Sequence, residues 1–374
     1  MQPHLTRALK DTPMQLGMFI MPSHPPERVL SEAYSFDLDV VEWADQLGYS
    51  EVWFGEHFTA PWEPVPAPDL LIAAAINRTK QIKLCPGAHL LPFHHPAALA
   101  HRLAQLDHMS GGRMLVGFGA GSVPTDFPLF GIDSSTGVQR QMMAEALEIV
   151  LKIWTEDGPW RYEGEFWTVE LAEEVLGFKP YLKPLQQPHP PLAVAGLSER
   201  SSSLRFAGTR GYIPLSLLFN PTYLKGHWDA YEEGAAASGH TVTRDAWRIV
   251  RDVFVADTDD EALDIARNGN QARQWVEGNL PLNRAAGWTK FLKHDPAVAD
   301  EDIDVEYLAR HLWLVGSPDT VAQKLLDVYD AVGGFGTLLV EEYDFVDQPH
   351  LWRRSMELLA TEVIPRFDKL LAKR

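Results

Sequence analysis

The sequence predicts an α/β protein, folded as a (β/α)8 TIM barrel with insertions, and two patterns support this. Short apolar stretches alternate with amphipathic helical stretches along most of the chain. Helices also end in glycine directly before an apolar run, as at Gly48, Gly211 and residues 333–334. Eight apolar stretches of this kind occur, which is the number of strands that closes such a barrel. A length of 374 residues suits one barrel with insertions.

The elements are predicted from these boundaries in chain order. Helices are expected between successive strands, a long helix over 136–154 is followed by a hairpin at 163–169, and a last helix covers 348–364. The predicted strands are residues 15–21, 51–55, 82–88, 114–118, 191–195, 212–217, 246–256 and 335–340.

The domain organisation follows from what lies outside these units. Residues 1–14 are predicted to be a flexible N-terminal arm and residues 15–374 a single domain, because no linker of low complexity divides the chain. An oversized segment, roughly 268–312, carries Trp275 and Trp288 among polar residues, with Trp313 following it. Long excursions of this kind are often lids, so this segment is predicted to cover a substrate.

Composition narrows the class of function. A formal net charge of −18 argues against nucleic acid or an anionic membrane as partner, and no apolar run is long enough to span a bilayer. The single cysteine, Cys85, excludes an internal disulfide and favours the cytoplasm. Twelve Trp and seventeen Phe suggest an aromatic-lined pocket for a small apolar substrate.

Residues 82–121 form the most informative stretch, because they predict a strand, a crossover helix and a second strand. Two parallel strands joined in this way end at the same edge of the sheet. Gly87 and Ala88 at the first end are therefore expected beside Gly119 at the second. Backbone without side chains on two neighbouring strand ends lets a flat ligand lie against it.

A second candidate ligand site follows the fifth strand. Gly196, Leu197 and Ser198 are predicted to open a helix, where backbone amides and the hydroxyls of Ser198 and Ser201 suit a phosphate. A plain helix N-cap by Ser198 explains the same pattern equally well. The glycines at 117, 119 and 121 do not make a dinucleotide fingerprint, because a proline-bearing loop follows them.

His57 ends the second strand, the position of catalytic residues in TIM barrels, where an imidazole is able to relay protons. Six histidines between 57 and 108 raise the alternative of a metal-dependent barrel hydrolase. However, the positions of His94, His95, His101 and His108 place most of them along a helix, and no carboxylate pair accompanies them. The site is therefore predicted to hold no metal.

Several motifs in order resemble the bacterial luciferase-like flavin-dependent monooxygenases, in particular limonene monooxygenase-type and diketocamphane monooxygenase proteins. The similarity extends from about Leu16 to the C-terminal helix. The residues that carry it are LGYSEVWFGEH (47–57), LPFHHP (91–96), LDHMSGGR (106–113), GFGAG (117–121) and VGSP (315–318).

The resemblance implies an enzyme that uses reduced FMN and O2 to oxygenate a small apolar substrate, such as a terpenoid or cyclic ketone, through a C4a-peroxyflavin. It implies a separate NAD(P)H:flavin reductase, a transient partner that supplies the reduced FMN, and a homodimer. Two alternatives stay open beside the metal hydrolase: a deazaflavin-dependent oxidoreductase of the same superfamily and a non-catalytic flavin-binding protein.

The resemblance also implies roles for individual residues. His57 matches a catalytic histidine, and Ala120 stands where the luciferases have a phosphate-binding arginine. The Gly87-Ala88 bond matches the site of a non-proline cis peptide or bulge behind the flavin ring. The implied cofactor-binding residues are Met21, Gly87, Ala88 and Gly119 near the ring, Asp126 near the ribityl chain, and Gly196, Leu197, Ser198 and Ser201 at the phosphate.

Overall fold

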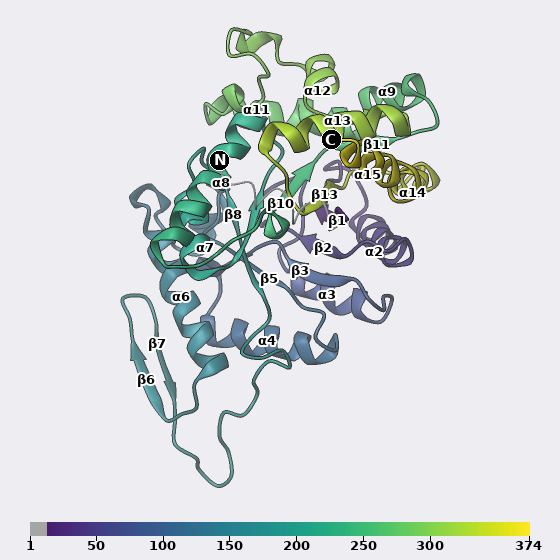
Figure 1. Cartoon of the computed structure of the whole chain (residues 1–374). Helices are drawn as coiled ribbons and strands as arrows, with labels where there is room; N and C mark the ends of the chain where they lie inside the picture. The colour runs from purple at the N-terminus through teal and green to yellow at the C-terminus, as the bar shows by residue number, and fades with distance from the viewer. Residues whose placement is uncertain (1–12) are drawn as a thin grey trace.

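The computed structural model describes residues 13–374 and confirms the predicted barrel (Figure 1). Most of the predicted N-terminal arm lies outside the described residues. Of its last two residues, Met14 is buried in the core, because the first strand begins directly after it.

Parallel strands form the barrel wall, and each of the eight predicted strands is found. The sheet order is β3-β2-β1-β13-β10-β9-β8-β5-β4, and a parallel bridge between Leu84 and Met114 closes the ring. The third predicted strand divides into β3 and β4 at Gly87-Ala88. The strands are β1 (Gln15–Ile20), β2 (Glu51–Phe54), β3 (Lys83–Pro86), β4 (His89–Leu90), β5 (Val116–Gly119), β8 (Leu192–Gly196), β9 (Ile213–Ser216), β10 (Arg248–Arg251) and β13 (Thr337–Glu341).

Apolar side chains fill the barrel interior, as expected for a packed core. Eight buried residues form this interior, seven of them within strands and Leu115 directly before β5: Phe19, Trp53, Cys85, Leu115, Ala193, Leu215, Val250 and Leu339. Towards the amino ends of the strands, Arg248 Nη2 pairs with Glu51 Oε2 at 3.0 Å. Apolar side chains and this ion pair therefore fill the barrel at the amino ends of its strands. A ligand site in the barrel is expected at the carboxyl ends of the strands.

Helices surround the barrel (Figure 1). Proline in the first turn starts several of them, and left-handed glycines at 211 and 333 end two of them. The helices are α2 (Leu30–Gln46), α3 (Pro68–Ile76), α4 (Pro96–Met109), α5 (Asp126–Leu129), α6 (Val138–Thr155), α7 (Ser202–Arg210), α8 (Pro221–Ala237), α9 (Asp259–Asn268), α13 (Pro318–Val332), α14 (Pro349–Leu358) and α15 (Ile364–Ala372).

The C-terminal helix is longer than predicted, because a π-helical turn at Leu359–Val363 joins α14 to α15 without a break. The predicted hairpin is present as β6 (Trp160–Glu163) and β7 (Thr168–Leu171). The seventh predicted strand was wrong in extent. It leaves the barrel at Asp252, whose carbonyl accepts from Leu314 N, and continues as β11 (Val253–Val255), which pairs with β12 (Leu314–Gly316).

The predicted lid segment is helical. It contains α10 (Asn270–Gln274), a π-helical turn at Trp275–Asn279, α11 (Leu280–Ala285) and α12 (Val305–His311). Trp275 and Trp313 are buried against each other, and Trp288 is partly buried. The segment is therefore packed on the barrel, while its closing over a substrate stays a prediction.

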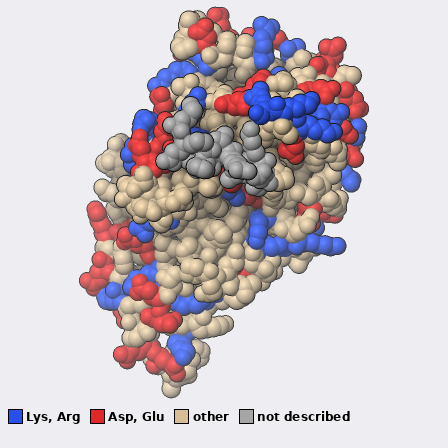
Figure 2. Space-filling view, viewed as in Figure 1, with Lys and Arg blue, Asp and Glu red and all other residues tan. Residues whose placement is uncertain are grey.

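The surface carries charged side chains of both signs. Figure 2 shows acidic and basic side chains intermixed on the face in view, with apolar and neutral residues between them. No helix within residues 13–374 combines the length and the apolarity that a membrane crossing requires.

Candidate active site

Three predicted ligand-binding segments meet at the carboxyl edge of the sheet. β4 pairs with β5, so that Leu90 lies opposite Gly119, and β5 pairs in turn with β8, which ends at Gly196. A methyl group placed on Gly119 would lie 3.5 Å from Cβ of Ala88. The Gly87-Ala88 peptide bond is cis, one of the two forms expected there. The structure thus brings Gly87, Ala88 and Gly119 together at one edge of the sheet, hereafter the ledge, with Leu90 Cδ2 beside Gly119.

Close packing explains why small residues are needed below the ledge. A Cβ on Gly87 would lie 2.9 Å from Cβ of Trp53, and a Cβ on Gly117 would lie 2.6 Å from the carbonyl oxygen of Pro86. Met21, a predicted ring contact, fills the space beside Gly55, where a Cβ would lie 2.2 Å from its sulfur. Met21, directly after β1, therefore packs against Gly55 and the apolar barrel interior at the carboxyl ends of the strands.

His57 sits beside two carboxylates. Its Nε2 lies 3.1 Å from Glu63 Oε2, and its Nδ1 lies 3.8 Å from Asp126 Oδ2. The other oxygen of Asp126 accepts from the amide of Thr59 at 2.8 Å. His57 Nδ1 and Asp126 Oδ2 are buried and have no hydrogen-bond partner among residues 13–374. The structure thus places two predicted site residues together with unused hydrogen-bonding capacity between them.

The electrostatics of this group favour a protonated imidazole. Burial lowers the pKa of His57, but the charges of Glu63 and Asp126 outweigh it, so the pKa is raised. Burial raises the pKa of Glu63, while the nearby His57 and the hydrogen bonds from Thr59 lower the pKa of Asp126 despite its burial. The arrangement is able to hold a proton at His57 and to exchange it with a ligand or with Glu63.

Sequence reasoning did not find Glu63. It lies in the proline-rich loop after β2, six positions beyond His57, and no periodic pattern points to it. The backbone amide of His57 donates to the carbonyl of Val65 at 2.9 Å, which folds this loop back over the strand end. The spacing alone contains no sign of that fold.

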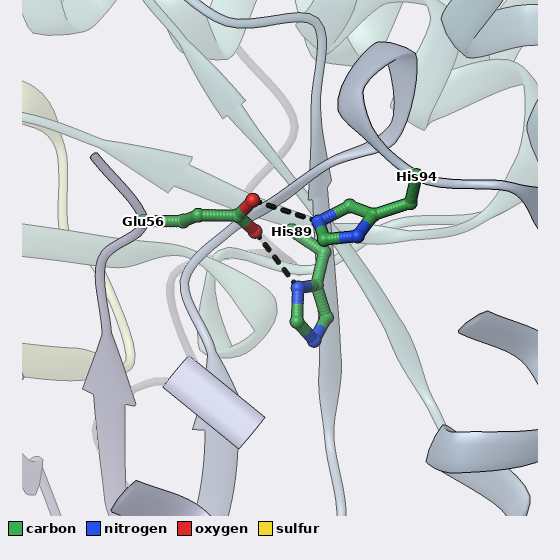
Figure 3. Close-up of side chains that lie close together, drawn as sticks. All are labelled: Glu56, His89 and His94. Carbon is green, nitrogen blue, oxygen red and sulfur yellow. Dashed lines mark hydrogen bonds and ion pairs between the residues drawn. The ribbon is translucent and has the colours of Figure 1, made fainter. Parts of the chain in front are cut away.

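A second histidine cluster surrounds Glu56, the chain neighbour of His57 (Figure 3). Glu56 Oε2 bonds His89 Nδ1 at 2.8 Å and the amide of Leu90 at 3.2 Å, and Oε1 bonds His94 Nε2 at 2.7 Å. Burial raises the pKa of Glu56, but these histidines outweigh it and lower the pKa to about 2. Glu56 thus fixes the segment that follows the ledge.

One expectation about these histidines was wrong. His94 and His95 precede α4, because Pro96 starts that helix, so only His101 and His108 lie along it. A single carboxylate, not a pair, lies with two of the histidines, and Glu56, His89 and His94 offer three ligand atoms close enough to hold a metal. Those atoms already bond one another at hydrogen-bond distances, which favours a structural role. The absence of a metal stays a prediction.

The predicted phosphate segment begins its helix later than expected. α7 starts at Ser202, and Ser201 is its N-cap, with Oγ accepting from the amide of Leu204 at 3.3 Å. Ser198 is exposed in the turn before the helix, so the N-cap expected there was wrong. Arg200, a possible substitute for the missing arginine, is paired with Glu233 together with Arg205.

Comparison with known proteins gives the family. The model of the family described as luciferase-like monooxygenase matches residues 14–334. The chain is 35% identical to 3,6-diketocamphane 1,6-monooxygenase of Pseudomonas putida, covering 96% of this chain and 100% of that protein. It is 31% identical to limonene 1,2-monooxygenase of Rhodococcus erythropolis, covering 96% of this chain and 88% of that protein.

Comparison with a solved structure supports the same family. The oxygenating constituent of 3,6-diketocamphane monooxygenase from Pseudomonas putida, described as a type II Baeyer-Villiger monooxygenase in complex with FMN, superposes with a TM-score of 0.90. The two sequences are 36% identical, and the match covers 95% of this chain and 98% of that chain. The resemblance stated from the motifs is thus confirmed.

Proposed function

The chain belongs to the luciferase-like monooxygenase family, and from this premise we propose that it is an FMN-dependent monooxygenase. It uses reduced FMN and O2 to oxygenate a small apolar substrate, of terpenoid or cyclic ketone type. The named relatives support the chemistry and the substrate class. The observation that carries the proposal in this chain is the ledge of small residues at the ends of β3 and β5, with the mostly buried His57 following the neighbouring strand β2.

The residues present fit FMN. The ledge carries only the methyl group of Ala88 besides two glycines, and a Cβ at Gly119 would lie 3.5 Å from that methyl group. His57 Nδ1 and Asp126 Oδ2 offer one nitrogen and one oxygen that lack partners within residues 13–374. When bound, reduced FMN supplies the electrons that activate O2 and carries the oxygen that is transferred.

The chain's own residues have three tasks in this proposal. The ledge orients the ring, and the turn at 196–201 receives the phosphate. His57 holds a proton at the reacting end and delivers it, with Glu63 and Asp126 setting its charge. The buried Trp275 of the lid segment and Trp313 directly after it exclude water, which competes with transfer of oxygen to the substrate.

The proposal also includes a separate flavin reductase. The FMN-bound relative is described as an oxygenating constituent, which implies a second component. Ala120 in place of an arginine suits a flavin that arrives reduced and leaves oxidised, because a weaker phosphate contact speeds release. We further propose a homodimer, by analogy with the family, and a cytoplasmic location.

The experiment combines purified protein, FMN, NADH and a generic flavin reductase with a panel of ketones, alkenes and thioethers under 18O2. We expect one 18O atom in the product of at least one ketone or alkene. Reduced deazaflavin in place of reduced FMN tests the oxidoreductase alternative, and elemental analysis tests the hydrolase. Product without 18O, or turnover only with deazaflavin, would overturn the proposal.

A further inference from the structure

We propose that His227, on α8, is the positioning residue of the segment that receives the FMN phosphate. The inference rests on the proposed function and goes beyond it by naming how this phosphate site keeps its shape. His227 does not touch the phosphate itself. It acts through the backbone of Ser198, the exposed residue between β8 and α7.

A chain of hydrogen bonds leads from the barrel wall to that backbone. Trp247 Nε1 donates to Ser216 Oγ at 2.9 Å, and Ser216 Oγ lies 2.9 Å from His227 Nδ1. His227 Nε2 lies 2.8 Å from the carbonyl oxygen of Ser198. An indole N–H only donates and a carbonyl only accepts, so every proton in this chain has one possible place. Ser216 donates to Nδ1, and Nε2–H donates to Ser198.

Burial supports this assignment. Trp247, Ser216 and His227 are completely buried. Burial lowers the pKa of His227 to about 4, so its imidazole is neutral near neutral pH and has one donor and one acceptor, as the chain requires. This hydrogen-bond chain, hereafter the relay, therefore orients the Ser198 carbonyl while its imidazole stays uncharged.

Two successive carbonyls are turned towards α8. The hydroxyl of Tyr223, one helical turn before His227, donates to the carbonyl of Leu197 at 2.6 Å. In a planar trans peptide the carbonyl and the following N–H point in opposite directions. The amides of Ser198 and Glu199 must therefore point away from α8. Neither amide donates a hydrogen bond to a residue within 13–374.

The glycine at the end of β8 allows this contact. A Cβ on Gly196 would lie 2.9 Å from Cε1 of His227 and 2.6 Å from Cδ1 of Leu204. The imidazole therefore packs directly on the backbone of the segment that it holds. This fixes both the distance and the register between α8 and residues 196–198.

The arginines near this segment are already paired, so phosphate binding depends on how the backbone amides are oriented. Arg200 and Arg205 both pair with Glu233, and Ala120 replaces the family's arginine. Phosphate affinity then depends on oriented amides and hydroxyls rather than on a free cation. Loss of the relay should show as a loss of the preference for FMN over riboflavin, which lacks the phosphate.

The test is a fluorescence titration of the full-length protein with FMN and with riboflavin. For His227→Phe we expect the dissociation constant for FMN to rise roughly tenfold, the effect of one directional hydrogen-bond network, while that for riboflavin changes less than about twofold. His227→Gln keeps a donor near the Nε2 position and should restore part of the preference. Thermal unfolding of each variant monitors the fold.

The matched control is His108→Phe. His108 Nε2 also bonds a backbone carbonyl, that of Lys183 at 2.9 Å, but it lies on the last turn of α4. We expect no change in either constant for this variant.

Two results separate this inference from the proposed function. If the wild-type protein binds FMN no better than riboflavin, the phosphate site itself is wrong and both fall. If the wild type prefers FMN and His227→Phe keeps that preference, or loses both ligands equally, the relay has no positioning role and only this inference falls.

Discussion

Glu56 and His57 are neighbours in the chain, yet they belong to two different kinds of site. Glu56 is buried, and both its oxygens accept hydrogen bonds, from His89, Leu90 and His94. His57 pairs with Glu63 through Nε2, while its Nδ1 has no partner among residues 13–374. The Glu56 carboxylate is thus fully bonded, although His89 Nε2 also lacks a partner among those residues, whereas both His57 Nδ1 and the nearby Asp126 Oδ2 are unpaired.

The difference teaches how to recognise function in a polar cluster. Buried polar groups are normally paired, and a carboxylate with both oxygens bonded makes a rigid support. Facing donor and acceptor atoms that stay unpaired cost stability, so they persist where a ligand completes them. We therefore propose that Glu56, His89 and His94 shape the ledge and that His57, Glu63 and Asp126 take part in the chemistry.

The distinction between Glu56 and His57 would fail most clearly if His57 were not needed for turnover. His57→Ala should lower turnover by roughly 10²–10⁴-fold, because a positioned proton donor is lost. Unfolding free energy should change by less than about 1 kcal/mol, since few of its hydrogen bonds are formed. Product formation with a flavin reductase and urea denaturation measure the two effects. Unchanged turnover would remove His57 from the site.

The opposite behaviour is expected for its neighbour. Glu56→Gln should lower the free energy of unfolding by about 3 kcal/mol, because a buried carboxylate loses charge-assisted bonds to two histidines. Glu42→Gln is the matched control, since Glu42 pairs with Arg78 at the surface and should cost less than about 1 kcal/mol. Equal costs in urea denaturation would contradict the distinction.

Low pH should weaken the hydrogen bonds of Glu56 to His89 and His94. The folded pKa of Glu56 is about 2, below its ordinary value of 4.5. Its contribution is therefore present above the unfolded pKa and is lost as pH falls through the folded pKa, by at most roughly 3 kcal/mol. The difference in unfolding free energy between wild type and Glu56→Gln should shrink from pH 5 to pH 2. Parallel curves would show that Glu56 is not held as a carboxylate.

A smaller effect is expected for Glu63, the carboxylate paired with His57. Glu63 raises the pKa of His57, so Glu63→Gln should move the alkaline limb of the pH–turnover profile to lower pH. Turnover at neutral pH should fall roughly tenfold. Glu32→Gln, at an exposed position on α2, serves as the control. An alkaline limb that stays in place would mean that Glu63 does not set the charge of His57.

Much of the fold follows from the sequence, because glycine-ended helices and apolar runs mark each strand. The break at Asp252 does not, since the apolar run continues on both sides of it. Likewise, Ser198, Ser201 and Ser202 are all plausible N-caps, and only packing on α8 selects Ser201. Local pattern thus predicts elements better than it predicts their ends.

The site was predicted unevenly for a similar reason. His57 and the ledge lie directly at strand ends, where topology determines their position. The pairing of Glu63 with His57 depends on how a proline-rich loop folds back, and that of His89 and His94 with Glu56 depends on the turn after Ala88. Side-chain partners of this kind are tertiary contacts, and spacing in the sequence does not contain them.

The most direct test of the account fills the ledge. Gly119→Leu adds a side chain whose Cβ lies 3.5 Å from Ala88 and meets only Leu90 more closely, at 3.1 Å. In an anaerobic titration with reduced FMN, we predict that this variant loses FMN binding at least tenfold while its thermal unfolding stays close to that of the wild type. Wild-type affinity in a folded Gly119→Leu variant would show that the flavin does not lie on this ledge.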